Sequence, residues 1–139
     1  MHQKIDALRT KTAAVLDRQL PAIRSELVEH RRFRIEQLEE LRVDATEAAV
    51  TADEPRLQVA RILESAAESA LSEIDAALQR LEDGSYGICG HCREPIHWER
   101  LDVLPMTRLC TPCQYVAESD MFRRSNGQPG PVRQPARGR

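Results

Sequence analysis

The chain has 139 residues, of which 30% are charged and 41% belong to the hydrophobic set AVILMFWYC. Its length suits one domain with an extension, and its apolar content is too high for disorder throughout. Its few aromatic residues disfavour a β-sandwich or a doubly wound sheet. Basic and acidic residues nearly balance, at 20 and 22. They are segregated, however, since residues 44–83 are acidic and residues 123–139 hold five arginines and no acid.

No run of about 18 or more apolar residues is present, which predicts that no segment crosses a membrane. The first residues, Met1 to Asp6, are not followed by an apolar run either, so no signal peptide is expected. These two expectations together predict a cytoplasmic protein.

Residues 4–43 are predicted to be helical, because their apolar residues recur mostly at steps of three or four. Pro21 lacks the amide hydrogen that a helix interior needs, so this run is expected either to kink at Pro21 or to start a second helix there. Residues 44–56 are rich in residues that end or cap helices, which predicts a break between two helices.

Residues 57–82 are predicted to form the next helix. Five of their apolar residues step by four, three, four and three, which is a heptad seam: Ala67, Leu71, Ile74, Leu78 and Leu81. Two helices around a short break predict an antiparallel coiled-coil hairpin within residues 1–83, with its tip near residues 44–55. The basic first arm is expected to pair with the acidic second arm, whereas the acidic break is expected to be uncovered.

Gly84 is predicted to end the second helix, because glycine readily adopts the left-handed conformation that follows many helices. The rest of the chain is divided into a cysteine-bearing finger with a short terminal helix (84–124, the helix at 114–124) and a disordered basic tail (125–139). The predicted fold class is therefore all-α, with a helical hairpin followed by a small four-cysteine module.

All the cysteines lie in one arrangement, C-x2-C-x17-C-x2-C, formed by Cys89, Cys92, Cys110 and Cys113. Two such turns complete a tetrahedral shell of four thiolates, and the spacing is typical of structural zinc sites. One structural Zn²⁺ is predicted, with Ile88, Ile96, Trp98, Leu101 and Leu109 packed around it. His91 and His97 are expected to be exposed rather than ligands, because four sulfurs already fill the shell.

Enzymatic activity is disfavoured, because no catalytic triad, phosphate loop or open metal position is recognisable. A DNA-binding zinc module is an alternative, since Arg93, Arg100 and Arg108 lie in the finger. The finger is nevertheless negative overall, and affinity for DNA depends on neutralising phosphates. A general protein-interaction module fits these observations better, and sequence-specific DNA binding is not expected.

The finger resembles the DksA/TraR-type zinc-finger family. The similar residues are Tyr86-Gly87-Ile88-Cys89-Gly90-His91-Cys92, Ile96, Arg100-Leu101, Pro105 and Leu109-Cys110-x2-Cys113. The resemblance is specific over residues 71–118, looser over 22–70 and absent from the tail. It implies a bacterial transcription factor that binds RNA polymerase, inserts the tip of its coiled coil through the secondary channel and changes the lifetime of promoter complexes.

The resemblance also implies functional residues at the tip, where the family has the pattern Asp-x-x-Asp-x-Ala. Asp44, Glu47 and Ala49 match it best, with Glu47 in place of the second Asp. Asp53 and Glu54 are rival candidates, because counting back from Cys89 places the tip a few residues later. Alternatively, these acids only cap helix ends.

Some family members respond to the alarmone ppGpp through basic residues at the base of the hairpin and on the finger. The matching positions hold Leu104 in place of Arg, Gln114 in place of Lys and Glu73 in place of Lys. Arg100 and Arg108 are the nearby cations that are candidates to compensate. Because these positions lack positive charge for a polyphosphate, the protein is expected to act on polymerase without requiring ppGpp.

Overall fold

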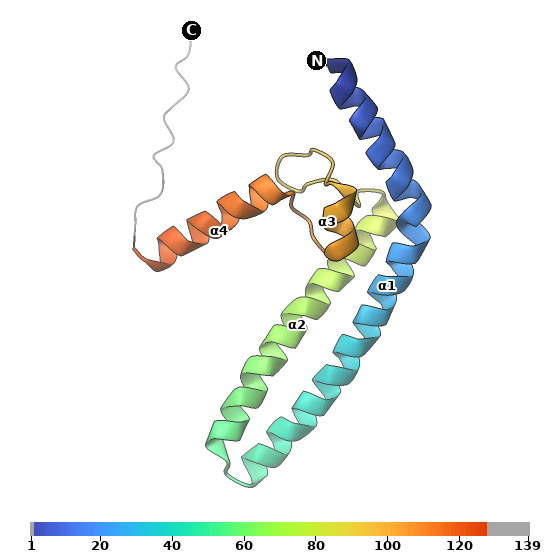
Figure 1. The fold of residues 1–139 in the computed structure, drawn as a ribbon. Coiled ribbons are helices and arrows are strands. Elements are labelled where there is room, and N and C mark those ends of the chain that lie inside the picture. Colours follow the sequence, from blue (N-terminus) through green and yellow to red (C-terminus); the bar gives the residue numbers. More distant parts are fainter. Residues whose placement is uncertain (1, 128–139) are drawn as a thin grey trace.

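The computed structural model describes residues 2–127, and every regular element within that range is a helix. Helices α1 (His2–Val50) and α2 (Glu54–Asp83) form an antiparallel hairpin, and α3 (Trp98–Val103) and α4 (Thr111–Ser125) lie in the C-terminal part (Figure 1). The predicted all-α hairpin is thus confirmed. The disorder predicted for residues 125–139 falls largely on 128–139, which lie outside the described residues, whereas Ser125 is the last residue of α4.

Pro21 lies inside α1 and does not divide it into two helices. Figure 1 shows α1 bending within its blue section, and a proline is an ordinary cause of such a bend because it removes one helical hydrogen bond. Of the two expectations for Pro21, the kink is therefore the one observed. None of the described helices is both long enough and apolar enough to cross a membrane.

The break between the helices is shorter than predicted, because α1 continues to Val50 and α2 already begins at Glu54. Residues 44–50 are therefore helical, as suits a segment rich in alanine. Helix α1 ends in a Schellman motif in which the Asp53 amide donates to Ala48 O at 2.9 Å and the Ala52 amide to Ala49 O at 3.3 Å. Ala52 takes the left-handed position, with φ 57°.

Both ends of α2 carry the predicted signals. The Asp53 side chain accepts a hydrogen bond from the Arg56 amide at 3.2 Å, and Pro55 lies in the first turn. Gly84 follows the last residue in the left-handed conformation, with φ 79°, and its amide donates to Arg80 O. At 1.5 Å per residue, the 30 residues of α2 span about 45 Å, which is longer than the predicted helix over 57–82.

The hairpin is packed differently at its two ends. Toward the tip, most of the buried residues are small: Ala48, Ala60 and Ala67. At the base, large apolar side chains from both helices are buried together with residues of the finger. This basal core contains Ile23, Leu27, Ile74, Ala77, Tyr86, Cys89, Ile96 and Leu101. The heptad seam is confirmed by the buried Ala67 and Ile74, and the core fixes the finger to the base of the hairpin.

The predicted pairing of a basic first arm with an acidic second arm is also confirmed. Three arginines of α1 donate to carboxylates of α2: Arg24 to Glu82 at 2.6 Å, Arg31 to Asp75 at 2.8 Å, and Arg42 to Glu64 and Glu68 at 3.1 and 3.2 Å. Each exposed pair stabilises the fold only slightly. Together they favour one register of the two helices, because a shift of either helix would break all of them.

Candidate metal centre and hairpin tip

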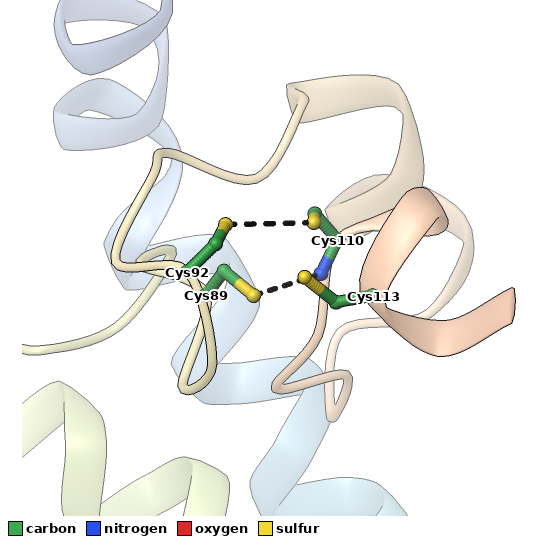
Figure 2. A group of neighbouring side chains, drawn as sticks. All are labelled: Cys89, Cys92, Cys110 and Cys113. Carbon is green, nitrogen blue, oxygen red and sulfur yellow. Dashed lines mark hydrogen bonds between the residues drawn. The ribbon is translucent and has the colours of Figure 1, made fainter. Parts of the chain in front are cut away.

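The four cysteines predicted as metal ligands come together at the base of the hairpin. Their sulfur atoms all lie within 4.8 Å of one another. Figure 2 shows Cys89 and Cys92 on one loop, facing Cys110 and Cys113 at the start of α4. The Cys92 and Cys110 sulfurs are 3.8 Å apart. A tetrahedral shell with Zn–S bonds of about 2.3 Å has edges of about 3.8 Å, so these thiols fit a four-thiolate zinc site.

Backbone hydrogen bonds hold the first cysteine pair in its turn. The Arg93 amide donates to Cys89 O at 3.0 Å, the Cys89 amide to Glu94 O at 2.8 Å, and the Gly90 amide to Arg108 O at 2.8 Å. Arg93 closes the turn in the left-handed region, with φ 63°. This geometry points both sulfurs of the C-x2-C turn toward the same side of the loop.

The second pair is placed by a helix terminus. Cys110 is the N-cap of α4, Pro112 lies in the first turn, and the Gln114 amide donates to Cys110 O at 2.9 Å. The Cys110 amide in turn donates to the Cys89 sulfur at 3.4 Å (Figure 2). Amide donors at the N-terminus of a helix stabilise nearby negative charge, which favours thiolates at this position.

The thiols differ in acidity. Burial raises the pKa of Cys89, but amide hydrogens from Cys110, Cys92 and His91 outweigh burial and lower that pKa to about 6. Hydrogen bonding to Cys110 raises the pKa of Cys113 to about 12. One thiolate forms readily, therefore, while burial and the neighbouring sulfurs raise the pKa of Cys92 and of Cys113 and oppose their ionisation. A bound divalent cation would offset this effect, as metal binding to thiolates requires.

The surroundings of the centre agree with most of the sequence predictions. Ile96 and Leu101 are buried, Trp98 and Leu109 pack partly buried against them, and Ile88 is exposed, contrary to the prediction. Ile88 forms an isolated antiparallel bridge with Pro95, and its side chain is 37% exposed. His91 and His97 are both exposed, as expected.

Tyr86 was not predicted to be a core residue. Its buried hydroxyl nevertheless donates to Pro105 O at 2.6 Å and joins the two halves of the finger.

At the tip, the structure separates the two sets of candidate residues. Asp44, Glu47 and Ala49 lie on the last two turns of α1, whereas Asp53 and Glu54 lie at the turn and at the start of α2. Asp53 caps α2, as the alternative interpretation of the acidic residues expected.

Asp44 and Glu47 both have a cationic partner, whereas the sequence predicted no basic partner for the acidic break. Arg56 of α2 reaches both: its Nε donates to Asp44 Oδ1 at 2.9 Å, its Nη2 donates to the same oxygen, and Nη2 also donates to Glu47 Oε2 at 3.0 Å. The sequence contained no signal for this contact, because it joins residues on two helices and depends on their register.

The positions compared for ppGpp lie on three different elements. Glu73 is exposed on α2, Leu104 caps the end of α3, and the Gln114 side chain in α4 donates to Glu118 at 2.8 Å. Arg100, a candidate to compensate, donates from Nε to Leu109 O at 3.0 Å and so braces the finger loop. Arg108 remains exposed near this loop.

Another arginine that sequence reasoning did not single out lies at the junction of finger and hairpin. Arg80 donates to Met106 O at 3.2 Å. Burial lowers its pKa, and the charge of the nearby Arg108 lowers it further. The hydrogen bond of Arg80 to Met106 O ties α2 to the finger loop.

A helical hairpin fixed at its base to a finger whose four cysteines could hold a metal ion is the arrangement of a coiled-coil protein with a zinc-finger-like module. Among solved structures, the transcription factor DksA2 from Pseudomonas aeruginosa is similar, with a TM-score of 0.69 and 27% sequence identity over 79% of this chain and 92% of that one. No protein-family model matches the chain.

Curated relatives match over shorter segments. An uncharacterized protein from Aquifex aeolicus is 46% identical over 50 residues, which are 36% of this chain and 34% of the relative. The RNA polymerase-binding transcription factor DksA from Caulobacter vibrioides is 46% identical over 44 residues, which are 32% of this chain and 31% of the relative. The matches thus span about a third of the length of these relatives. With the fold shared with DksA2 and the four cysteines, these matches show that the chain is similar to proteins of the DksA family.

Proposed function

We propose that this protein is a transcription factor, not an enzyme, that binds RNA polymerase directly and regulates initiation by inserting its hairpin tip through the secondary channel. The observation that carries the proposal is the fold: a long hairpin fixed at its base to a finger, shared with the DksA2 structure over 79% of the chain. The relative from Caulobacter vibrioides is an RNA polymerase-binding transcription factor. The proposal places the protein in the cytoplasm, where bacterial polymerase acts.

The first test is a pull-down of purified core polymerase with the tagged chain. We expect one polymerase to be retained per factor, and the retention to survive moderate salt. Random duplex DNA in the same assay tests the alternative DNA-binding function. DNA binding that falls steeply with salt, without retention of polymerase, would contradict the proposal.

The zinc ion is part of this proposal. Cys89, Cys92, Cys110 and Cys113 would hold it, and the soft thiolate donors favour zinc over magnesium or calcium. A closed four-thiolate shell has no position for substrate, so the ion would act structurally and fix the base of the hairpin. Elemental analysis of freshly purified protein should find close to one equivalent, and less than half an equivalent would count against the site.

The proposed acting residues are Asp44, Glu47 and Ala49, with Asp53 and Glu54 as rivals. Their test is the pair of substitutions Asp44→Asn and Glu47→Gln in one chain, with polymerase affinity and transcription both measured. Lost transcription with retained affinity supports the assignment, because the tip acts after docking. Unchanged transcription together with unchanged affinity would reject the assignment, and the same experiment on Asp53→Asn and Glu54→Gln would then test the rival residues.

The protein is also proposed to act without requiring ppGpp. Glu73, Leu104 and Gln114 offer no cation, and Arg100 is already engaged with Leu109 O. The test is transcription in vitro with the factor titrated with and without ppGpp, on a polymerase that lacks any other ppGpp site. A shift of about tenfold or more in the half-maximal factor concentration would show that a ppGpp site exists despite these residues.

A further inference from the structure

The ion pairs between the two helices change direction at the tip. In the four pairs nearer the base, the arginine belongs to α1 and the carboxylate to α2. At the tip the arginine is Arg56 of α2, and the carboxylates are Asp44 and Glu47 of α1. A single guanidinium therefore faces the two acids that are the proposed acting residues.

The two acids are held unequally. Asp44 receives hydrogen bonds from two nitrogen atoms of Arg56 on one oxygen, and its side chain is 39% exposed. Glu47 receives one, from Nη2 at 3.0 Å, and its side chain is 63% exposed. A guanidinium that engages a carboxylate through two donors fixes its geometry, whereas a single contact at an exposed side chain exchanges easily with solvent or with a partner.

Charge leads to the same distinction. The group formed by Arg56, Asp44 and Glu47 carries one net negative charge rather than two. Because Asp44 is the acid more fully engaged by Arg56, the remaining charge is presented outward mainly by Glu47.

We propose that Arg56 is a positioning residue of the tip: it binds Asp44 as an internal anchor that joins the last turns of α1 to the first turn of α2, and it leaves Glu47 as the carboxylate presented to the partner. This inference rests on the proposed function for the role of Glu47. The anchoring of Asp44 by Arg56 is a property of the free protein and is tested independently.

The experiment uses the full zinc-loaded chain and two readouts. Amide hydrogen exchange over residues 45–60 reports how firmly the turn is held, and transcription with polymerase reports action. Asp44→Asn and Arg56→Gln should each speed exchange at the tip by about three- to fivefold. The double variant should be no faster than either single variant, because both remove the same contact. Glu47→Gln should leave exchange as in the unsubstituted chain.

Transcription should show the opposite pattern for the two acids. Glu47→Gln should reduce the change in transcription that a saturating concentration of the protein causes by about tenfold. Its affinity for polymerase should stay within about threefold of that of the unsubstituted chain. Asp44→Asn should cause a smaller loss, in proportion to the loosened tip. Arg42→Gln is the matched control, since Arg42 also binds two carboxylates across the hairpin but lies farther from the tip. It should leave both tip exchange and transcription unchanged.

Equal effects of Asp44→Asn and Glu47→Gln on both readouts would overturn the division of roles. Unchanged tip exchange in Arg56→Gln would overturn the anchor. If the unsubstituted chain does not bind polymerase at all, the proposed function fails and the role of Glu47 fails with it, while the exchange measurements still decide whether Arg56 anchors Asp44.

Discussion

Replacing Ile74 by alanine should weaken the joint between hairpin and finger more than a comparable change elsewhere on α2. Ile74 is 0% exposed and packs in the basal core with residues of both helices and of the finger. The substitution removes three carbon atoms, at about 0.8 kcal/mol per buried methylene. The cavity left in a close-packed core adds about 1 kcal/mol, so the free energy of unfolding should fall by about 3 kcal/mol.

The matched control is Ile62→Ala on the same helix. Ile62 is 62% exposed, so the same chemical change should alter the free energy of unfolding by less than about 0.5 kcal/mol. Both variants are measured by urea denaturation of the zinc-loaded chain, followed by helical circular dichroism and by the fluorescence of Trp98, which packs partly buried against the basal core. Equal losses in the two variants, or a loss below about 1 kcal/mol for Ile74→Ala, would refute the packing described for this joint.

Three further predictions concern the finger and the helix ends. Removing the metal with a chelator, or replacing Cys110 by serine, should loosen the finger and the adjoining helix ends. The reason is that a structural zinc contributes on the order of 10 kcal/mol to folding. Unchanged Trp98 fluorescence after either change would contradict this prediction. Ala52→Gly should raise the free energy of unfolding by about 0.5–1 kcal/mol, since glycine adopts φ 57° without strain, and denaturation measures the change. Hydrogen bonds from Ser85 lower the pKa of Asp83 below its ordinary value of 3.8. The stability that the ionised Asp83 contributes is therefore present above pH 3.8 and is lost as the pH falls through the lowered pKa. Asp83→Asn should make the free energy of unfolding less dependent on pH over that acidic range.

The parts of the fold that the sequence predicted are those set by local chemistry. The cysteine spacing predicted that the four sulfurs form one group able to bind a metal ion, and the sulfurs do come together. The heptad seam predicted the burial of Ala67 and Ile74. Gly84 predicted the end of α2. In each case the residue type and its spacing along the chain are sufficient, because the structure they favour involves only their neighbours or a regular repeat.

The parts that were missed depend on strain or on contacts across the fold. The end of α1 was placed too early because Ala52, not glycine, occupies the left-handed position. The contact of Arg56 with Asp44 and Glu47 depends on the register of two helices. One missed feature did have a signal: α4 begins at Thr111, three residues earlier than predicted, and Pro112 is favourable in the first turn of a helix.

The different packing of the two ends of the hairpin bears on the proposed function. At the base, large apolar side chains hold the finger in place, and four cysteines that could hold a metal ion lie beside them. Toward the tip, the seam is formed largely by alanines, whose small side chains let two helices approach closely. A hairpin that is narrow toward its tip suits entry into a narrow channel. Because the alanines at this end bury little apolar surface, the turn between the helices must be held by polar contacts. Those contacts are the Asp53 cap and the reversed ion pair of Arg56. Of the two acids that Arg56 contacts, Glu47 has a single and exposed contact, so Glu47 is the carboxylate of the tip that a partner can most easily engage.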